Sequence, residues 1–164
     1  MDGFYRWATA RRRAWLLAAL AGAIAPGGCE KWELDARVRE LCAKDGGMRI
    51  HETVVLPPEQ FDQWGMVKFY RPTEGENALG PEYVFRHEVI YFRRGNPQMT
   101  RTRYGIQRRA DGKLLGESIL YGRGGGDMPG PWHESSFSCP ETLSAGPNAL
   151  IQAVMKAKPE GARP

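Results

Sequence analysis

Three histidines are the side chains of this sequence best suited to metal binding or acid–base chemistry. They are His51, His87 and His133, and each is followed directly by a glutamate. They lie far apart along the chain, and no two have the spacing of paired metal ligands. Neighbouring side chains of a strand point to opposite faces, so a strand histidine and the glutamate beside it are not a ready-made site. We therefore expect surface or half-buried histidines, with no bound metal and no cofactor.

A glycine-rich stretch at residues 122–131 (GRGGGDMPGP) resembles a phosphate-binding loop in composition. It lacks the Gly-Lys-Ser/Thr ending of a P-loop, and no clear helix follows to offer its N-terminus to an anion. We expect a mobile or ligand-contacting surface loop instead. The alternative is a small periplasmic hydrolase or metal-dependent enzyme that uses His133 with Glu134 or Asp127 beside this loop. No Gly-x-Ser-x-Gly elbow occurs in the sequence, so we assign no catalytic residue.

Arginines gather between residues 93 and 109 and suggest a binding surface. They are Arg93, Arg94, Arg101, Arg103, Arg108 and Arg109. On two neighbouring strands they would form a basic strip for an anionic lipid, glycan or protein, and we name Arg101 and Arg103 as binding residues of that strip. The alternative is a solvated sheet face whose charges protect an edge. Trp132 and His133 are further candidates for a recognition surface, with core packing of Trp132 near Cys139 as the alternative.

The N-terminal segment 11–29, RRRAWLLAALAGAIAPGGC, has the layout of an export signal. Three arginines precede a short apolar run, and small residues follow at a cleavage site. The apolar run covers residues 14–25 and is too short to cross a bilayer, which takes about 20 residues. We therefore predict a signal peptide at residues 1–28 and a protein that acts in the periplasm, with the export pathway, Sec or twin-arginine, left open.

The signal also carries most of the positive charge of the chain. The whole sequence has 23 Lys and Arg against 19 Asp and Glu, and residues 1–28 hold four of these arginines and one aspartate. The remainder therefore has 19 against 18, which is a net charge of +1. A nearly neutral chain argues against nucleic acid as the partner.

The end of the signal resembles the lipobox of bacterial lipoproteins, in which a cysteine after small residues becomes the lipidated first residue. Gly27-Gly28 suits the two positions before Cys29, while Pro26 stands where that family prefers leucine. The resemblance implies acylation of Cys29 and a membrane anchor. Glu30, in place of aspartate, does not resemble the inner-membrane retention signal. Two alternatives stay open: cleavage after Ala21-Gly22-Ala23, which gives a free periplasmic protein, and an uncleaved anchor.

Lipidation of Cys29 would leave Cys42 and Cys139 as the only other cysteines of the chain. An oxidising periplasm favours a disulfide between them. This bond would close a loop of about 100 residues, for which the chain-entropy account gives up to about 4.7 kcal/mol of stabilisation. In a cytosolic protein the alternative would be two buried free thiols.

The pattern after the signal predicts a single α+β domain at residues 29–158 and a flexible tail at 159–164. We expect an antiparallel sheet of about four strands with an N-terminal and a C-terminal helix. Apolar spacing places the helices at 30–44 and 147–157. β-prone runs and turn residues place strands at 48–56, 83–93, 100–109 and 113–121, with room for a short strand at 66–70. We also expect both helices on one face of the sheet, joined through the cysteine pair.

The run Glu30–Gly47 is similar to small proteobacterial envelope lipoproteins and periplasmic proteins of uncharacterised function, and the likeness extends to two later segments. The residues that carry it are Trp32, Leu41-Cys42, Asp45-Gly46-Gly47, Gly75–Glu82 and Gly130–His133. The resemblance implies an envelope location and supplies no activity, substrate or catalytic residue. With the signal, it leads us to predict an envelope lipoprotein, for which we favour the outer membrane over the inner membrane. Its domain would be non-catalytic and would bind or scaffold an envelope protein, an anionic lipid or a glycan.

Overall fold

The first element of the fold is the helix α2, Gly27–Asp45, in a computed structural model that describes residues 27–127 and 133–159. It confirms the helix predicted at 30–44. Val38 is fully buried, and Leu34 and Leu41 pack beside it, so the apolar spacing of the sequence does mark the inner side of the helix. The predicted signal segment up to residue 26 lies outside the described residues.

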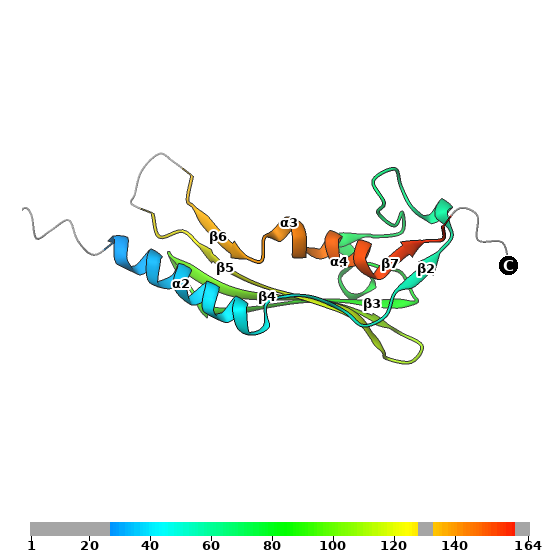
Figure 1. Ribbon diagram of the computed structural model, residues 1–164, viewed down its shortest axis with the longest axis horizontal. Helices are drawn as coiled ribbons and strands as arrows, with labels where there is room; N and C mark the ends of the chain where they lie inside the picture. The colour runs from blue at the N-terminus through cyan, green and yellow to red at the C-terminus, as the bar shows by residue number, and fades with distance from the viewer. Residues whose placement is uncertain (1–26, 128–132, 160–164) are drawn as a thin grey trace, which may run out of the picture.

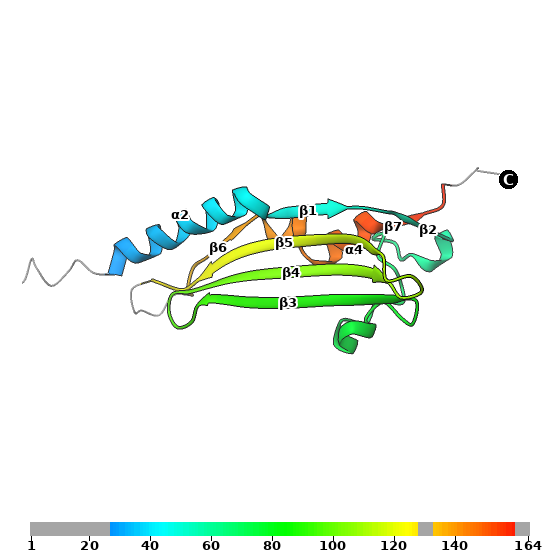
Figure 2. The same cartoon turned by 90° about the horizontal axis from the view of Figure 1, so that it is seen from below.

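Five strands make up the main sheet, and all neighbouring pairs are antiparallel. They are β1 (Gly47–Ile50), β3 (Tyr83–Arg93), β4 (Gln98–Arg108), β5 (Leu114–Gly124) and β6 (Ser136–Cys139). The order is β1–β5–β4–β3, and β6 also pairs with β5. β1 and β6 lie end to end along the same edge of β5, as Figure 2 shows. The predicted α+β class is confirmed, but the predicted count of about four strands is too low.

The elements missed by the sequence patterns are short. β6 reads SFSC, which has little β-prone character. The predicted strand at 48–56 is split, because β2 (Val54–Leu56) leaves the main sheet and pairs in parallel with β7 (Met155–Ala157). No strand forms at 66–70, where a single bridge joins Phe61 to Val67. Two short 3₁₀ helices, η1 (Pro58–Gln60) and η2 (Pro72–Asn77), lie in the connections.

The helices cover opposite faces of the sheet (Figure 1). α2 packs on the face of β5 that carries Ile119 and Tyr121. The short helices α3 (Thr142–Ala145) and α4 (Pro147–Val154) lie on the face that carries Gly116 and Ser118. Our expectation that both helices cover one face of the sheet is therefore wrong. The reason is that β6 lies in the plane of the sheet, so the chain after β6 can leave toward the face opposite α2.

Close approach of α4 to β5 depends on the absence of a side chain at Gly116. A Cβ atom there would lie 2.7 Å from Cγ2 of Val154 and 3.3 Å from Cδ1 of Leu150. Beside this contact, the buried Ser118 hydroxyl donates a hydrogen bond of 2.6 Å to the carbonyl oxygen of Ala145. Two small residues on one face of β5 thus fix the position of the C-terminal helices.

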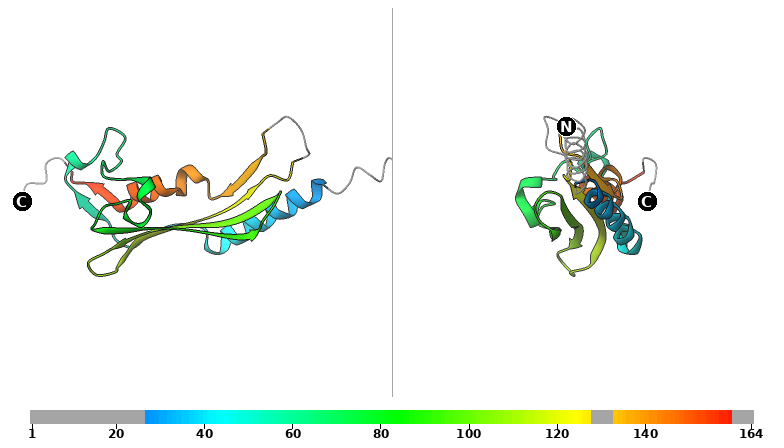
Figure 3. Two further views of the ribbon diagram at one scale, coloured as in Figure 1. Left: turned by 180° about the vertical axis from the view of Figure 1, so that it is seen from behind. Right: turned by 90° about the vertical axis from the view of Figure 1, so that its left-hand side faces the viewer.

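Two separate hydrophobic clusters result from this arrangement. The larger lies beneath α4 and consists of Val67, Ala78, Leu79, Tyr83, Phe85, Ile106, Leu115, Leu150, Ile151, Val154 and Met155. The smaller lies beneath α2 and consists of Val38, Met99, Ile119 and Tyr121. Each half of the long sheet is therefore covered on only one face by a helix, and the molecule is elongated (Figure 3).

The Cys42–Cys139 disulfide predicted from the sequence is present, with the two Cα atoms 5.8 Å apart and a sequence separation of 97. It joins the last turn of α2 to the end of β6. The guanidinium of Arg39 lies 4.6 Å above the centre of the Phe137 ring beside it. The disulfide therefore connects the N-terminal helix covalently to the edge strand of the sheet.

A buried ion pair holds the first half of α2. Asp35 and Arg123 are 7% and 3% exposed, and Nε of Arg123 donates to the Asp35 carboxylate at 2.7 Å. The same guanidinium also donates to the carbonyl oxygens of Gly125 and Ser135. Each nitrogen of the buried guanidinium donates to an oxygen, so this pair links α2, β5 and the segment before β6.

Candidate interaction surface

The outer edge of β3 is open over most of its length. β3 is the last strand in the order β1–β5–β4–β3, and within the described residues no other strand pairs with its outer side. η2 packs against the first part of β3, where Arg86 and Glu76 form an ion pair of 3.2 Å. Beyond that point the edge runs free to the turn into β4, as Figure 2 shows. An open edge of this kind is a template for pairing with another strand.

Apolar side chains cover both faces of this open stretch. Val89, Ile90, Tyr91 and Phe92 are 42%, 48%, 43% and 52% exposed. Val89 and Tyr91 alternate with Ile90, so the first two lie on one face and Ile90 on the other. Edge strands of stable monomers commonly carry charges, bulges or proline that discourage pairing. β3 has a bulge between Tyr91 and Arg93, but its middle is four consecutive apolar residues.

The backbone of the open stretch also has free hydrogen-bonding groups. At the start of β3, the N–H of Arg109 donates to the carbonyl of Glu82, which identifies this pair as hydrogen-bonded. Hydrogen-bonded and non-hydrogen-bonded pairs alternate along an antiparallel ladder. The register of β3 with β4 then directs the N–H and C=O of Ile90 toward β4, and those of Val89 and Tyr91 outward. The outward groups are ready to bond a further strand.

Opposite charges lie at the two ends of the open stretch. At one end, the carboxylate of Glu88 lies 3.8 Å from Arg103, and its side chain is half exposed. At the other end, Arg93 forms an ion pair with Glu30 of α2, and the guanidinium of Arg94 lies 4.4 Å above the Tyr91 ring. The stretch therefore runs from an acidic end through an apolar centre to a basic end.

The predicted basic strip is matched by carboxylates. Arg101 donates to Asp45 at 3.1 Å, and Arg103 donates to Glu117 at 2.8 Å. The Tyr121 hydroxyl donates to Asp45 at 2.6 Å, and this bond, with the nearby Arg101, holds the pKa of that carboxyl below its ordinary value. Arg101 and Arg103 do share one face of β4, as the alternation predicts. That face is a network of ion pairs rather than an uncompensated cationic strip.

The histidines do not converge within the described part of the chain, where no group of three or more His, Cys, Asp or Glu side chains could hold a metal ion. His87 stacks on Tyr104 with ring centres 4.8 Å apart. His133 is exposed at the start of the segment that leads into β6. Trp132, named with it as a candidate binding residue, lies outside the described residues.

The carboxylates considered as partners of His133 already have donors. Asp127 accepts from Lys31 at 2.6 Å and from the N–H and hydroxyl of Ser135. Glu134 accepts from the side-chain amide of Asn96 at 2.6 Å. These bonds tie the loop after β5 to α2 and to the β3–β4 turn. The observed role of both carboxylates is thus to hold neighbouring segments together.

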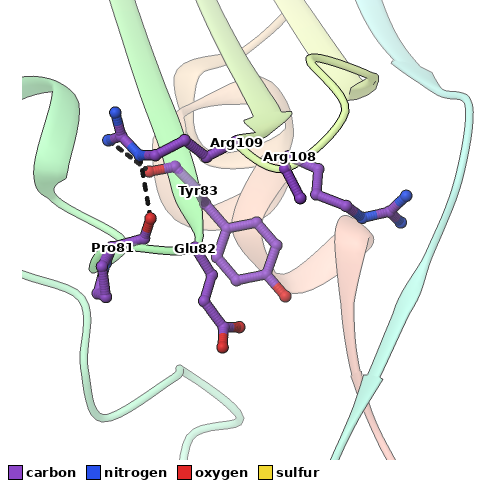
Figure 4. A pocket seen from close by; sticks show the side chains of 6 residues that line it. Pro81, Glu82, Tyr83, Arg108 and Arg109 are labelled. Atoms are coloured by element: carbon purple, nitrogen blue, oxygen red, sulfur yellow. Dashed lines mark hydrogen bonds between the residues drawn. The ribbon is translucent and has the colours of Figure 1, made fainter.

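A shallow depression of about 450 Å³ lies at the other end of the sheet, lined by Pro81, Glu82, Tyr83, Arg108, Arg109 and Ala110 (Figure 4). Arg109 donates to the carbonyl oxygens of Pro81 and Tyr83, as the dashed lines in Figure 4 show. Arg108 pairs with Glu52 and Asp111. Because both guanidiniums are already bonded to oxygens of this chain, the depression has little capacity left to bind an anion.

Comparison with known proteins gives no relative: no family model, no characterised protein and no solved structure matches this chain. In the described residues, no helix has both the length and the apolar character needed to cross a membrane. The side chain of Cys29 lies outside the described residues, so its acylation stays a prediction.

Sequence reasoning located β3 but missed the open edge. The run from Val89 to Phe92 is continuously apolar, a pattern typical of a strand that is buried on both faces. No helix of the described chain covers β3 on both sides, so the same pattern here marks an exposed surface. The signal for an interaction surface was therefore present in the sequence, but only the strand order could interpret it.

Proposed function

We propose that this protein is an envelope lipoprotein, anchored through Cys29, whose domain is a non-catalytic module that binds another envelope component through the open edge of β3. The single observation that carries the binding role is the stretch Val89–Phe92, which exposes apolar side chains on both faces and free backbone groups at its edge. Exposed apolar surface of this kind is characteristic of interaction sites.

The position of the edge fits an anchored protein. Arg93, at the basic end of the open stretch, pairs with Glu30, which directly follows the predicted lipidated cysteine. Acyl chains contribute about 0.8 kcal/mol per buried CH₂, so a multiply acylated Cys29 would hold α2 firmly at a membrane. The disulfide and the Asp35–Arg123 pair make α2 and the sheet one unit. Anchoring α2 would therefore also hold the open edge at the membrane surface.

The anchoring half of the proposal is tested by mass spectrometry of the exported protein with a Cys29→Ser variant as the control. The expected result is a chain that begins at an acylated Cys29 and contains the Cys42–Cys139 disulfide, with loss of membrane retention in the variant. An unmodified chain that begins at Met1 would contradict the proposal.

The binding half is tested by placing a charge in the centre of the open edge. Ile90→Lys should lower the size of the complex that the native protein forms in mildly solubilised envelopes, because an edge lysine cannot be buried without cost. Val55→Lys is the matched control, since Val55 is also an exposed strand residue, 59% exposed on β2. Equal complex sizes for the two variants would argue against β3 as the binding edge.

A further inference from the structure

We infer that the strand bound at the open edge of β3 is the β3 of a second copy of this chain, paired antiparallel about Ile90. The inference rests on the proposed function, because it names the partner of the same edge. The result would be one continuous sheet across two molecules, in the order β1–β5–β4–β3–β3–β4–β5–β1.

Charge complementarity favours a second copy in this direction. The open stretch has Glu88 at one end and Arg93 and Arg94 at the other, with apolar residues between. With the axis on Ile90, Glu88 of each copy lies opposite Phe92 of the other and next to Arg93, so Arg93 has Glu30 of its own chain on one side and Glu88 of the second copy on the other. Parallel pairing would place like charges together, which destabilises cross-strand neighbours.

The space beside β3 limits the register. η2 lies against the beginning of β3, around Arg86, so an added strand has room only from about residue 87 onward. A two-fold axis at Ile90 pairs the part of β3 beyond η2 with the same part of the second copy, and the added strand does not meet η2. Centring it on Glu88 would set two carboxylates opposite each other and would push the second strand into η2.

The same register satisfies both the backbone and the side chains. The outward N–H and C=O groups of Val89 and Tyr91 meet those of Tyr91 and Val89 in the second copy, as a hydrogen-bonded ladder requires. On one face each valine then lies opposite a tyrosine, a favourable β-branched–aromatic pair. On the other face, Ile90 meets Ile90 of the second copy at the two-fold axis.

The symmetry also agrees with anchoring. A two-fold axis perpendicular to the sheet keeps equivalent faces on the same side, so both α2 helices lie on one face of the combined sheet. Two Cys29 anchors could then reach a single membrane surface. A ladder of this length is smaller than a stable interface, which buries about 800 Å² per partner, so we expect a dimer that forms at high local concentration.

The test is disulfide trapping of the full exported chain in its own envelope. In the proposed register, the two copies of residue 90 form a non-hydrogen-bonded pair with Cα atoms about 4.5 Å apart, which is within disulfide range. Ile90→Cys should therefore give, on mild oxidation, an adduct of twice the chain mass with Cys42–Cys139 intact. Val55→Cys, which is more exposed, should give far less.

The outcomes distinguish pairing with a second copy from binding of β3 to a different protein. A dimeric adduct specific to Ile90→Cys supports the inference. An adduct of Ile90→Cys with a different protein overturns the dimer and leaves β3 as a binding edge. Ile90→Cys that stays single, or that dimerises no more than Val55→Cys, overturns the dimer. Because a different partner without a thiol at this position forms no adduct, the binding role of β3 is then decided by the Ile90→Lys experiment.

Discussion

Arg123 is the residue on which the junction between α2 and the sheet most depends. It lies 3% exposed between Asp35 of α2 and the carbonyl oxygens of Gly125 and Ser135. A buried charge pair contributes little net stability compared with an apolar pair, but removal of one partner leaves an uncompensated charge. The sequence gives no warning of this contact, since Asp35 and Arg123 are far apart and look like ordinary surface residues.

Asp35→Asn should therefore destabilise the protein strongly, by about 3 kcal/mol, because it leaves the Arg123 guanidinium buried without its counter-charge. Urea unfolding followed by tryptophan fluorescence measures the change. Glu40→Gln is the control, because Glu40 pairs with Arg37 and Lys44 on the exposed side of the same helix and should cost much less. Equal losses in the two variants would show that the buried pair has no special role.

Asp127 gives the protein a specific sensitivity to acid. Lys31, and then the N–H and hydroxyl of Ser135, hold the pKa of the Asp127 carboxyl far below its ordinary value of 3.8. The folded chain thus takes up this proton later than the unfolded chain does. The stabilisation is complete above about pH 3.8 and is lost as the pH falls toward the folded-state pKa.

Asp127→Asn should therefore be less stable than the native chain at neutral pH and should lose less further stability on acidification below about pH 3.8. Urea unfolding at neutral pH and at a series of acidic pH values measures both effects. Asp62→Asn is a useful comparison, because Asp62 caps a local turn by accepting from the N–H groups of Trp64 and Met66. Parallel stability curves for the native chain and Asp127→Asn would contradict the assignment.

At the scale of elements, the long strands follow directly from the sequence and the short ones do not. The apolar run locates β3 at its observed bounds, and the alternation locates β4 to within two residues at its start and one at its end. β6 and β7 have three or four residues each, and they are held in place by their neighbours β5 and β2 rather than by their own propensity. Contacts with neighbouring strands leave no pattern in the local sequence. The number of strands predicted from the sequence is therefore too low.

The packing of α4 on β5 can be tested at Gly116. Gly116→Ala should destabilise the protein by about 1–3 kcal/mol, because the new Cβ would overlap the side chain of Val154 and press on Leu150. Gly105→Ala, on the adjacent strand, is the matched control, since a Cβ there meets its nearest neighbours at 3.8 Å, an ordinary contact. Thermal unfolding gives the melting temperature of each variant. Equal melting temperatures would show that the packing of α4 does not depend on this close approach.

At the scale of the whole molecule, two helical layers on opposite faces leave one long edge free. The disulfide, the buried ion pair and the smaller hydrophobic cluster lie near β5 and the strand β6 beside it. The larger hydrophobic cluster lies beneath α4. Stabilising contacts are therefore concentrated on one side of the sheet. The outer half of β3 has few of them, which is consistent with a surface that is completed by a partner.

The candidate site was only partly visible in the sequence. The charge of Arg101 and Arg103 predicts a binding role, but their carboxylate partners Asp45 and Glu117 come from elements that the sequence pattern does not place beside them. The open edge depends on the strand order, in which β3 is terminal. Export, by contrast, was inferred from a local N-terminal signal and needs no tertiary structure.

Residue-resolved hydrogen exchange of β3 shows whether a partner strand occupies its open edge. The outward N–H groups of Val89 and Tyr91 should exchange slowly in the native envelope and quickly in the dilute, purified chain, because only the former contains the bound strand. The inward N–H of Ile90, bonded to β4, should be protected in both and serves as the internal reference. Fast exchange at Val89 and Tyr91 under both conditions would show that the edge is free in the envelope and that β3 binds no partner there.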